Sequence, residues 1–170
     1  MNRHVISILV ENHAGVLSRV TGLFSRRCYN IDSLSVGETE DGKFSRITVV
    51  LHGDAYVIEQ IQKQLAKLVE VVNVAELVPE ASVYRELALV KVNASAEIRA
   101  EVVAIVEIFR ANIIDVSTGT ITVELTGDQA KIAAFTELME PYGIKEIART
   151  GLTGLQRGAE HIRKTIEEEK

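Results

Sequence analysis

The sequence is poor in the residues that most often carry metal, redox or base-stacking chemistry. It has one cysteine, no tryptophan and only 5% aromatic residues. Cys28 alone cannot form an internal disulfide or supply the paired thiolates of a zinc site. The histidines show no i, i+4 pair and no neighbouring cysteine; they are His4, His13, His52 and His161. The composition therefore argues against a metal cluster or a sulfur-based cofactor site.

Long apolar runs and excess positive charge are also missing. No apolar run approaches the ~18 residues of a membrane span, and the first residues lead into a strand pattern without a signal-peptide core. The net charge is −5 and the pI is 5.4, which disfavours binding to nucleic acid phosphates or an anionic membrane surface. We expect a soluble, cytoplasmic protein with neither nucleic acid nor membrane as a partner.

Motifs of the common catalytic sites do not occur. The sequence has no Gly-x-Ser-x-Gly elbow and no phosphate-binding glycine loop that ends in Lys-Ser or Lys-Thr. Most carboxylates fall on the polar faces of predicted helices, and no strand has the Tyr/Phe-rich pattern with which RNA-binding split βαβ domains stack bases. We predict that the chain has no catalytic residue and no metal site. A small α+β enzyme and an RNA-binding module remain minor alternatives.

The chain does have a regular order of secondary-structure patterns. With 46% hydrophobic residues among 170, it can bury a substantial core. Alternating and helical apolar spacings predict, in order, a strand near 3–11, a helix carrying 16–24, strands at 31–36 and 44–51, a helix at 57–68 and a strand at 71–78. The second half predicts a strand at 87–92, a helix at 98–109, strands at 113–116 and 121–125, a helix carrying 132–139 and a strand at 144–148.

The same βαββαβ order thus occurs twice, as in ferredoxin-like folds. We predict an α+β protein of two small domains, residues 1–79 and 80–170, with Pro79 ending the first. The repeat is one of element order and not of residue identity. The charged tail after Gly154, which ends in Glu-Glu-Glu-Lys, is expected to be a solvated or frayed helix end.

The first strand-to-helix turn, residues 11–17, is the most distinctive segment. A helix N-terminus presents unpaired N–H groups and partial positive charge, which suit a small carboxylate. Gly15 would let a ligand approach the backbone, and Asn12 could donate and accept hydrogen bonds with an amino acid. A purely structural interpretation stays open, because asparagine is also a good helix N-cap and glycine can relieve a tight turn.

Long stretches of the sequence resemble the small subunit of acetolactate synthase, also called acetohydroxyacid synthase. The first is Val-Glu-Asn-His-Ala-Gly-Val-Leu-Ser-Arg-Val-Thr-Gly-Leu-Phe-Ser-Arg-Arg at 10–27, followed by Tyr-Asn-Ile-Asp-Ser-Leu at 29–34. The similarity continues at residues 45–48, 60–65, 67–69, 89–92, 109–110, 113–116 and 154–158. It therefore covers nearly the whole chain.

This resemblance implies a function. In that family, residues 1–79 would form an ACT domain that dimerises and binds an effector amino acid, and residues 80–170 a C-terminal α+β regulatory domain. The chain would be a non-catalytic regulatory subunit in branched-chain amino acid biosynthesis. It would activate a separate large catalytic subunit, which carries thiamine diphosphate, FAD and Mg, and confer feedback inhibition by valine. The alternative is a free-standing ACT sensor that regulates another enzyme or a transcription factor.

The resemblance also implies which residues form the effector site. The motif places Asn12, Gly15, Val16 and Leu17 of one chain with Asn30 and Ile31 of the other chain of a homodimer. No cofactor is expected in this chain itself. The sequence leaves open the selectivity for valine over leucine and isoleucine, the stoichiometry of the holoenzyme and the domain that contacts the catalytic subunit.

One position departs from the family pattern. Relatives usually carry glycine where this chain has Cys28, immediately after the first predicted helix. If that position needs a positive φ, cysteine costs on the order of 1 kcal/mol there. A packed, unreactive role is the expectation for this cysteine, ahead of a reactive thiol.

Overall fold

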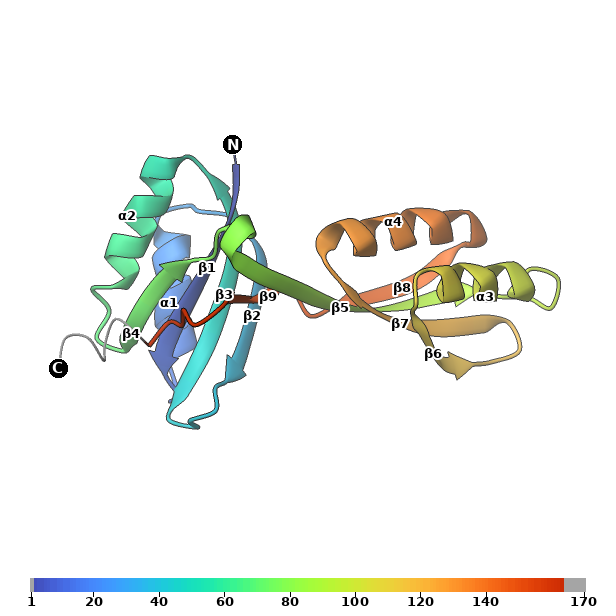
Figure 1. Cartoon of the computed structure of the whole chain (residues 1–170), viewed down its shortest axis with the longest axis horizontal. Helices are drawn as coiled ribbons and strands as arrows, with labels where there is room; N and C mark the ends of the chain where they lie inside the picture. Colours follow the sequence, from blue (N-terminus) through green and yellow to red (C-terminus); the bar gives the residue numbers. More distant parts are fainter. Residues whose placement is uncertain (1, 164–170) are drawn as a thin grey trace. The chain divides into compact units, whose positions relative to one another are not determined.

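The structure is a computed structural model that describes residues 2–163 (Figure 1). It forms two compact units, one made of residues 2–83 together with 152–163, and the other of Tyr84–Gly151. The chain thus builds most of the first unit, then the whole of the second, and finally returns to the first.

The first unit is a four-stranded antiparallel sheet with two helices. Its elements are β1 (Asn2–Glu11), α1 (Val16–Arg26), β2 (Ile31–Glu38), β3 (Phe44–Gly53), α2 (Ala55–Leu65) and β4 (Val71–Glu76). The strand order is β2-β3-β1-β4, so β2 and β4 form the two edges. This is the βαββαβ order predicted from the sequence.

Strand alternation gives this sheet a helix-covered face. Ile6, Ile8 and Val10 of β1 belong to one buried cluster with apolar residues of α1 and α2. Successive strand residues point to opposite faces, so Ser7 and Leu9 point to the other face, which we call the open face. They are nevertheless buried, with exposed fractions of 0% and 1%. Something other than the helices must therefore cover the open face.

The returning C-terminal segment lies on that open face. We call residues 152–163 the strap; it contains the short strand β9 (Thr153–Gln156), which pairs with β5. Leu152 donates from its N–H to Ser33 Oγ (2.9 Å) and accepts from Ser35 Oγ (3.0 Å) on β2. At the other end of the strap, Ile162 accepts from the Asn73 amide on β4 (2.6 Å). The strap thus spans the open face from one edge strand to the other.

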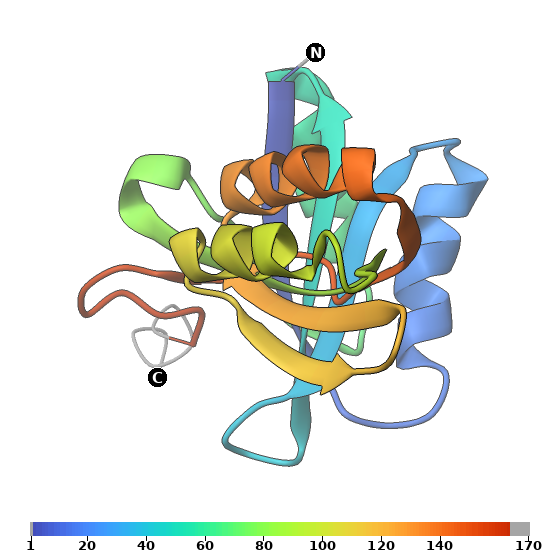
Figure 2. The same ribbon diagram turned by 90° about the vertical axis from the view of Figure 1, so that its right-hand side faces the viewer.

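The second unit repeats the architecture. Its elements are β5 (Ser82–Asn93), α3 (Arg99–Ile108), β6 (Asn112–Val116), β7 (Thr120–Gly127), α4 (Gln129–Met139) and β8 (Ile144–Arg149), with 3-10 turns η1 (Pro79–Ala81) before β5 and η2 (Glu140–Tyr142) before β8. The order is β6-β7-β5-β8. α3 and α4 lie side by side on one face of this sheet (Figure 2), where Phe109 and Phe135 meet edge to face at 5.4 Å.

The fold class is confirmed, but the division of the chain differs from the prediction. Residues 152–163 pack on the first unit and not with the domain predicted at 80–170. β9 was not predicted, and β5 begins five residues before the predicted start at 87. β9 has only four residues and lacks the alternation of apolar and polar residues from which a strand is predicted. The Glu-Glu-Glu-Lys end of the tail lies outside the described residues.

Candidate functional site

The distinctive turn of the sequence forms an open helix N-terminus. Gly15 is the N-cap of α1, with φ 90° and ψ −16°, and no side chain accepts a hydrogen bond at this cap. The first N–H groups of a helix have no intrahelical partner, so those of Leu17 and Ser18 are available at the end of α1. They provide hydrogen-bond donors together with the positive end of the helix dipole.

Glycine is needed at position 15 for its backbone and not for lack of space. A φ of +90° is strained for any residue with a Cβ. A Cβ built on Gly15 would meet no atom of residues 2–163 within 4 Å, so these residues leave the space beside the helix end open. The turn interpretation is thereby confirmed, and the same open space leaves room for a ligand to approach the backbone.

Asn12 does not cap the helix. Its amide nitrogen donates to Glu38 Oε1 (2.9 Å) and to the main-chain oxygen of Gly42 (2.9 Å). Its own main-chain N–H donates to the oxygen of Lys43 (2.8 Å). The N-cap interpretation of Asn12 is therefore wrong: this side chain joins the end of β1 to the β2–β3 hairpin, residues 39–43.

Two other predicted residues differ in what they can offer a ligand. The side chain of Leu17 is 42% exposed beside the helix N-terminus, whereas Val16 is 3% exposed and belongs to the core cluster. Leu17 can thus supply an apolar contact at this end of α1. Val16 can contribute only its backbone.

Asn30 and Ile31 lie at the opposite end of the sheet from Asn12. Ile31 pairs with Leu51, near the start of β1, whereas the end of β1 pairs with Phe44. Seven residues of strand separate these two levels, or about 23 Å at the usual strand rise. One chain therefore cannot bring all the predicted site residues together.

Charges of both signs surround the helix end. The carboxylates of Glu11 and Glu38 contact the turn that precedes α1: Glu11 pairs with His13 Nε2 at 3.1 Å, and Glu38 accepts from the Asn12 amide at 2.9 Å. On the open face, burial lowers the pKa of the Arg46 guanidinium; Glu40 opposes this shift and Arg163 adds to it. An N-terminal helix dipole beside acidic groups is suited to a zwitterion, with its carboxylate at the helix and its ammonium near the acids.

Sequence reasoning missed the hairpin side of this site. Glu38, Gly42 and Lys43 hold Asn12 in place, but they follow it by about thirty positions. No local spacing links residues that meet only through strand pairing. The sequence predicted the two strands on either side of this hairpin, at 31–36 and 44–51, and gave no sign of the contact between the hairpin and residue 12.

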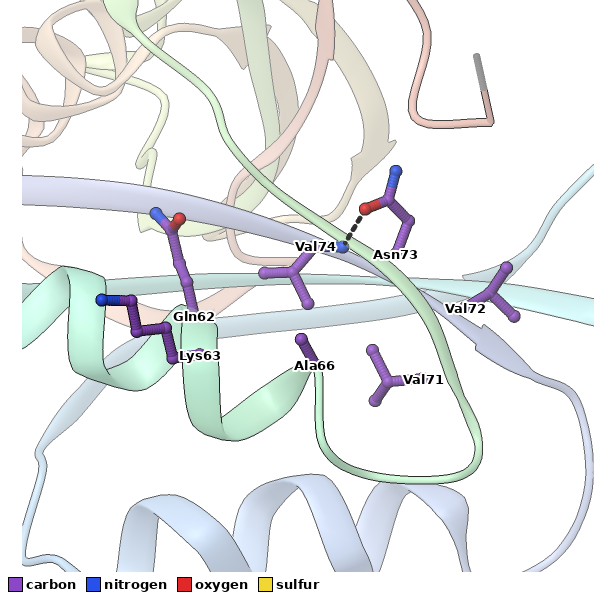
Figure 3. Close-up of a pocket in the computed structure, with 7 residues that line it drawn as sticks. All are labelled: Gln62, Lys63, Ala66, Val71, Val72, Asn73 and Val74. Carbon is purple, nitrogen blue, oxygen red and sulfur yellow. Dashed lines mark hydrogen bonds between the residues drawn. The ribbon is translucent and has the colours of Figure 1, made fainter. Parts of the chain in front are cut away.

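A hollow of about 290 Å³ lies elsewhere in the first unit (Figure 3). It is formed between the end of α2 and β4, and contains no predicted site residue. Ala66, Val71 and Val74 lie close together in it, while the Asn73 amide points away from them. Its single cation, Lys63, is paired with Glu59. It is therefore a weaker candidate for an amino acid than the helix end.

Comparisons with known proteins give the same assignment for both halves. Residues 6–73 match the family model described as an AHAS small subunit-like ACT domain. Residues 85–158 match the one described as the small subunit of acetolactate synthase.

Whole-length relatives agree with the family models. The chain is 53% identical over 156 residues to the probable acetolactate synthase small subunit of Archaeoglobus fulgidus, covering 92% of this chain and 98% of the relative. It is 47% identical to the acetolactate synthase small subunit of Bacillus subtilis, with 93% and 92% covered. The crystal structure of the Thermotoga maritima small subunit superposes with a TM-score of 0.87 at 44% identity, covering 94% and 100%.

The chain belongs to the acetolactate synthase small-subunit family. It is therefore a regulatory small subunit in branched-chain amino acid biosynthesis, with a separate catalytic subunit as its partner. This family assignment favours the regulatory-subunit prediction over the free-standing sensor. Among residues 2–163, no helix is long and apolar enough to cross a membrane.

Cys28 of this small subunit does have the positive φ whose cost was considered from its sequence position. Its φ is +56°, the left-handed region that favours glycine. The N–H of Tyr29 reaches back to the oxygen of Phe24 (3.0 Å), closing α1 with a Schellman motif. The cysteine is exposed and not packed as expected.

Proposed function

We propose that this small subunit activates the catalytic subunit of acetolactate synthase and makes it sensitive to feedback inhibition by valine. The observation that carries the effector site is the uncapped N-terminus of α1, open beside Gly15 and flanked by Asn12 and Leu17. The chemistry of thiamine diphosphate, FAD and Mg would belong to the catalytic subunit. This chain would contribute the binding free energy that links valine to the enzyme's activity.

The helix end has the parts that an aliphatic amino acid needs. The N–H groups of Leu17 and Ser18 would receive the carboxylate, and the Glu38–Asn12 pair would face the ammonium side. The exposed Leu17 side chain would contact the aliphatic group. An apolar pocket distinguishes one methylene by only about 1 to 3 kcal/mol, so we expect leucine and isoleucine to bind more weakly than valine and not to be excluded.

A second copy of the chain would complete the site. β2 is an edge strand with an exposed Val36, and edge strands pair readily with one another. If two copies related by a two-fold axis pair β2 antiparallel, the start of one β2 faces the end of the other. Ile31 of the second copy would then lie opposite Glu38, which holds Asn12. Such a homodimer brings Asn30 and Ile31 to the helix end that they cannot reach within one chain.

Inhibition requires that valine bind two states of the complex with different affinity. A coupling of about 1 to 3 kcal/mol would change activity by roughly fivefold to more than a hundredfold. A site shared by two chains is well placed for this, because a small rotation of one chain against the other alters the contacts to the bound ligand.

The test is the activity of the purified catalytic subunit with and without this chain, titrated with valine at fixed salt and subunit ratio. Wild type should stimulate activity, and valine should reverse the stimulation. The Asn12→Ala variant should stimulate the catalytic subunit as strongly as wild type does. It should shift the valine inhibition curve about tenfold to higher concentration, because residue 12 could no longer hydrogen-bond the charged ammonium group of the ligand.

Asn112→Ala is the matched control, because Asn112 is an exposed asparagine of the second unit. It should leave the valine curve unchanged. The melting temperature of each variant is needed too, since Asn12 also holds the hairpin. An Asn12→Ala curve that overlays wild type would remove this residue from the site, and stimulation without any valine response would remove the effector assignment.

A further inference from the structure

Arg163, the last residue of the strap, contacts the β2–β3 hairpin that holds Asn12. Arg163 Nη2 donates to Thr39 Oγ1 (3.1 Å), and Nη1 pairs with Glu40 Oε1 (3.0 Å). The guanidinium carbon lies 4.9 Å from the centre of the Phe44 ring, in cation–π contact. One side chain, 27% exposed, therefore contacts three residues of the hairpin and its junction with β3.

The same hairpin is hydrogen-bonded to Asn12. Thr39 Oγ1, which accepts from Arg163, also donates to the oxygen of Asp41 (2.9 Å). The next two residues, Gly42 and Lys43, accept the side-chain and main-chain bonds of Asn12. An unbroken series of hydrogen bonds and short backbone segments thus runs from Arg163 to Asn12.

Burial and hydrogen bonds hold the strap against the first unit, and with it the backbone that carries Arg163. Leu152 and Ile162 are buried, with exposed fractions of 2% and 5%. Both are hydrogen-bonded to the sheet, Leu152 to β2 and Ile162 to β4. The guanidinium that follows Ile162 is therefore held over the hairpin by packing on the open face.

We propose that Arg163 is a positioning residue for the effector site: it holds the hairpin so that Asn12 is ready to receive the amino acid. This inference rests on the proposed function. Binding to a prearranged group avoids the free-energy cost of ordering it. Without Arg163 the hairpin and Asn12 sample more conformations, and each binding event must first order them.

The test is direct calorimetric binding of valine to the whole chain in complex with its catalytic subunit, together with the inhibition curve. Arg163→Ala should weaken valine binding by about threefold to tenfold, as expected for a residue that couples to a site without contacting the ligand. Stimulation of the catalytic subunit should remain. Arg163→Lys, which can keep the Glu40 pair but not the planar stacking on Phe44, should restore part of the affinity.

Arg157→Ala is the matched control. Arg157 lies on the same strap, but its guanidinium donates to the Ser82 oxygen (3.1 Å) and not to the hairpin. It should leave valine affinity unchanged. A general weakening of the strap would instead reduce affinity in both variants and lower both melting temperatures alike, which would overturn a specific role for Arg163.

A double-mutant cycle separates positioning from packing. If Arg163 acts through Asn12, Arg163→Ala should have little further effect on valine affinity in an Asn12→Ala background. Additive losses, or an Arg163→Ala affinity equal to wild type, would overturn the inference. Failure of the wild-type complex to bind valine at all would instead overturn the proposed function, so the two failures are distinguishable.

Discussion

At the residue scale, two backbone positions with positive φ enclose α1 and have opposite consequences. Gly15 precedes the helix with a φ of 90°, which glycine adopts without strain. Cys28 follows the end of the helix with a φ of 56°, which is strained for a residue with a Cβ. The first position leaves the helix N-terminus open for a ligand. The second stores a small conformational cost close to Asn30, which begins the other half of the proposed site.

Cys28→Gly should stabilise the protein. Glycine relieves the left-handed strain, although its greater freedom in the unfolded chain offsets part of the gain, so we expect an increase of about 0.5 to 1 kcal/mol in the free energy of unfolding. Urea denaturation measures it. Cys28→Ala is the control: it removes the thiol but keeps the Cβ, and should give no comparable gain. Equal gains from both variants would show that the thiol, not the backbone, carries the cost.

At the element scale, the two halves share capping chemistry as well as strand order. α2 and α4 each begin with a Gly-Asp pair, and the aspartates accept from the N–H three residues on, at 2.8 Å for Asp54 and 2.9 Å for Asp128. α1 and α3 both end in Schellman motifs with a non-glycine residue at positive φ, Cys28 and Arg110. The repeat therefore extends to helix ends, beyond the order of elements.

Asp54→Ala and Asp128→Ala should each destabilise the unit that contains them by about 1 kcal/mol, the usual cost of losing an N-cap. Asparagine at either position keeps the accepting oxygen and should retain most of the stability. Hydrogen exchange in α2 and α4 would assign each loss to its own unit. A loss in Asp→Asn as large as in Asp→Ala would mean that the charge, and not the hydrogen bond, stabilises the helix.

At the scale of the whole molecule, the distance between Asn12 and Asn30 within one chain makes a dimer-shared site testable by mixing. Asn12→Ala and Asn30→Ala should each impair valine inhibition as homodimers. In a heterodimer of the two, one site combines Asn12 of one chain with Asn30 of the other and is intact, while its counterpart carries both substitutions.

When the two variants are mixed in equal amounts and refolded, about half of the dimers should be heterodimers, each with one intact site of its two. The mixture should therefore recover about a quarter of the high-affinity valine sites of wild type, as counted by calorimetry. The double variant Asn12→Ala/Asn30→Ala, mixed with itself, is the control and should recover none. No recovery on mixing, with exchange of chains demonstrated by mass, would show that each site is built within a single chain.

Local pattern determined much of this protein. The period-two and helical spacings of apolar residues gave the element order in both halves, because burial of one face imposes that period on the sequence. The turn at 11–17 was recognisable as a helix N-terminus, and the place of Cys28 immediately after the first helix made a positive φ there a possibility to consider. Each of these features depends on residues within a few positions of one another.

Only the tertiary structure decided what depends on distant residues. Asparagine is a common N-cap residue, yet strand pairing places Glu38 and Gly42 within reach of the Asn12 side chain. Gly15 occupies the N-cap position instead, and no side chain caps the helix. Val16 fits the pattern of a site residue, but the packing of α1 turns its side chain into the core. The strap was unpredictable for the same reason: a segment of 152–163 with few apolar residues finds its place only because the sheet leaves an uncovered face to bury.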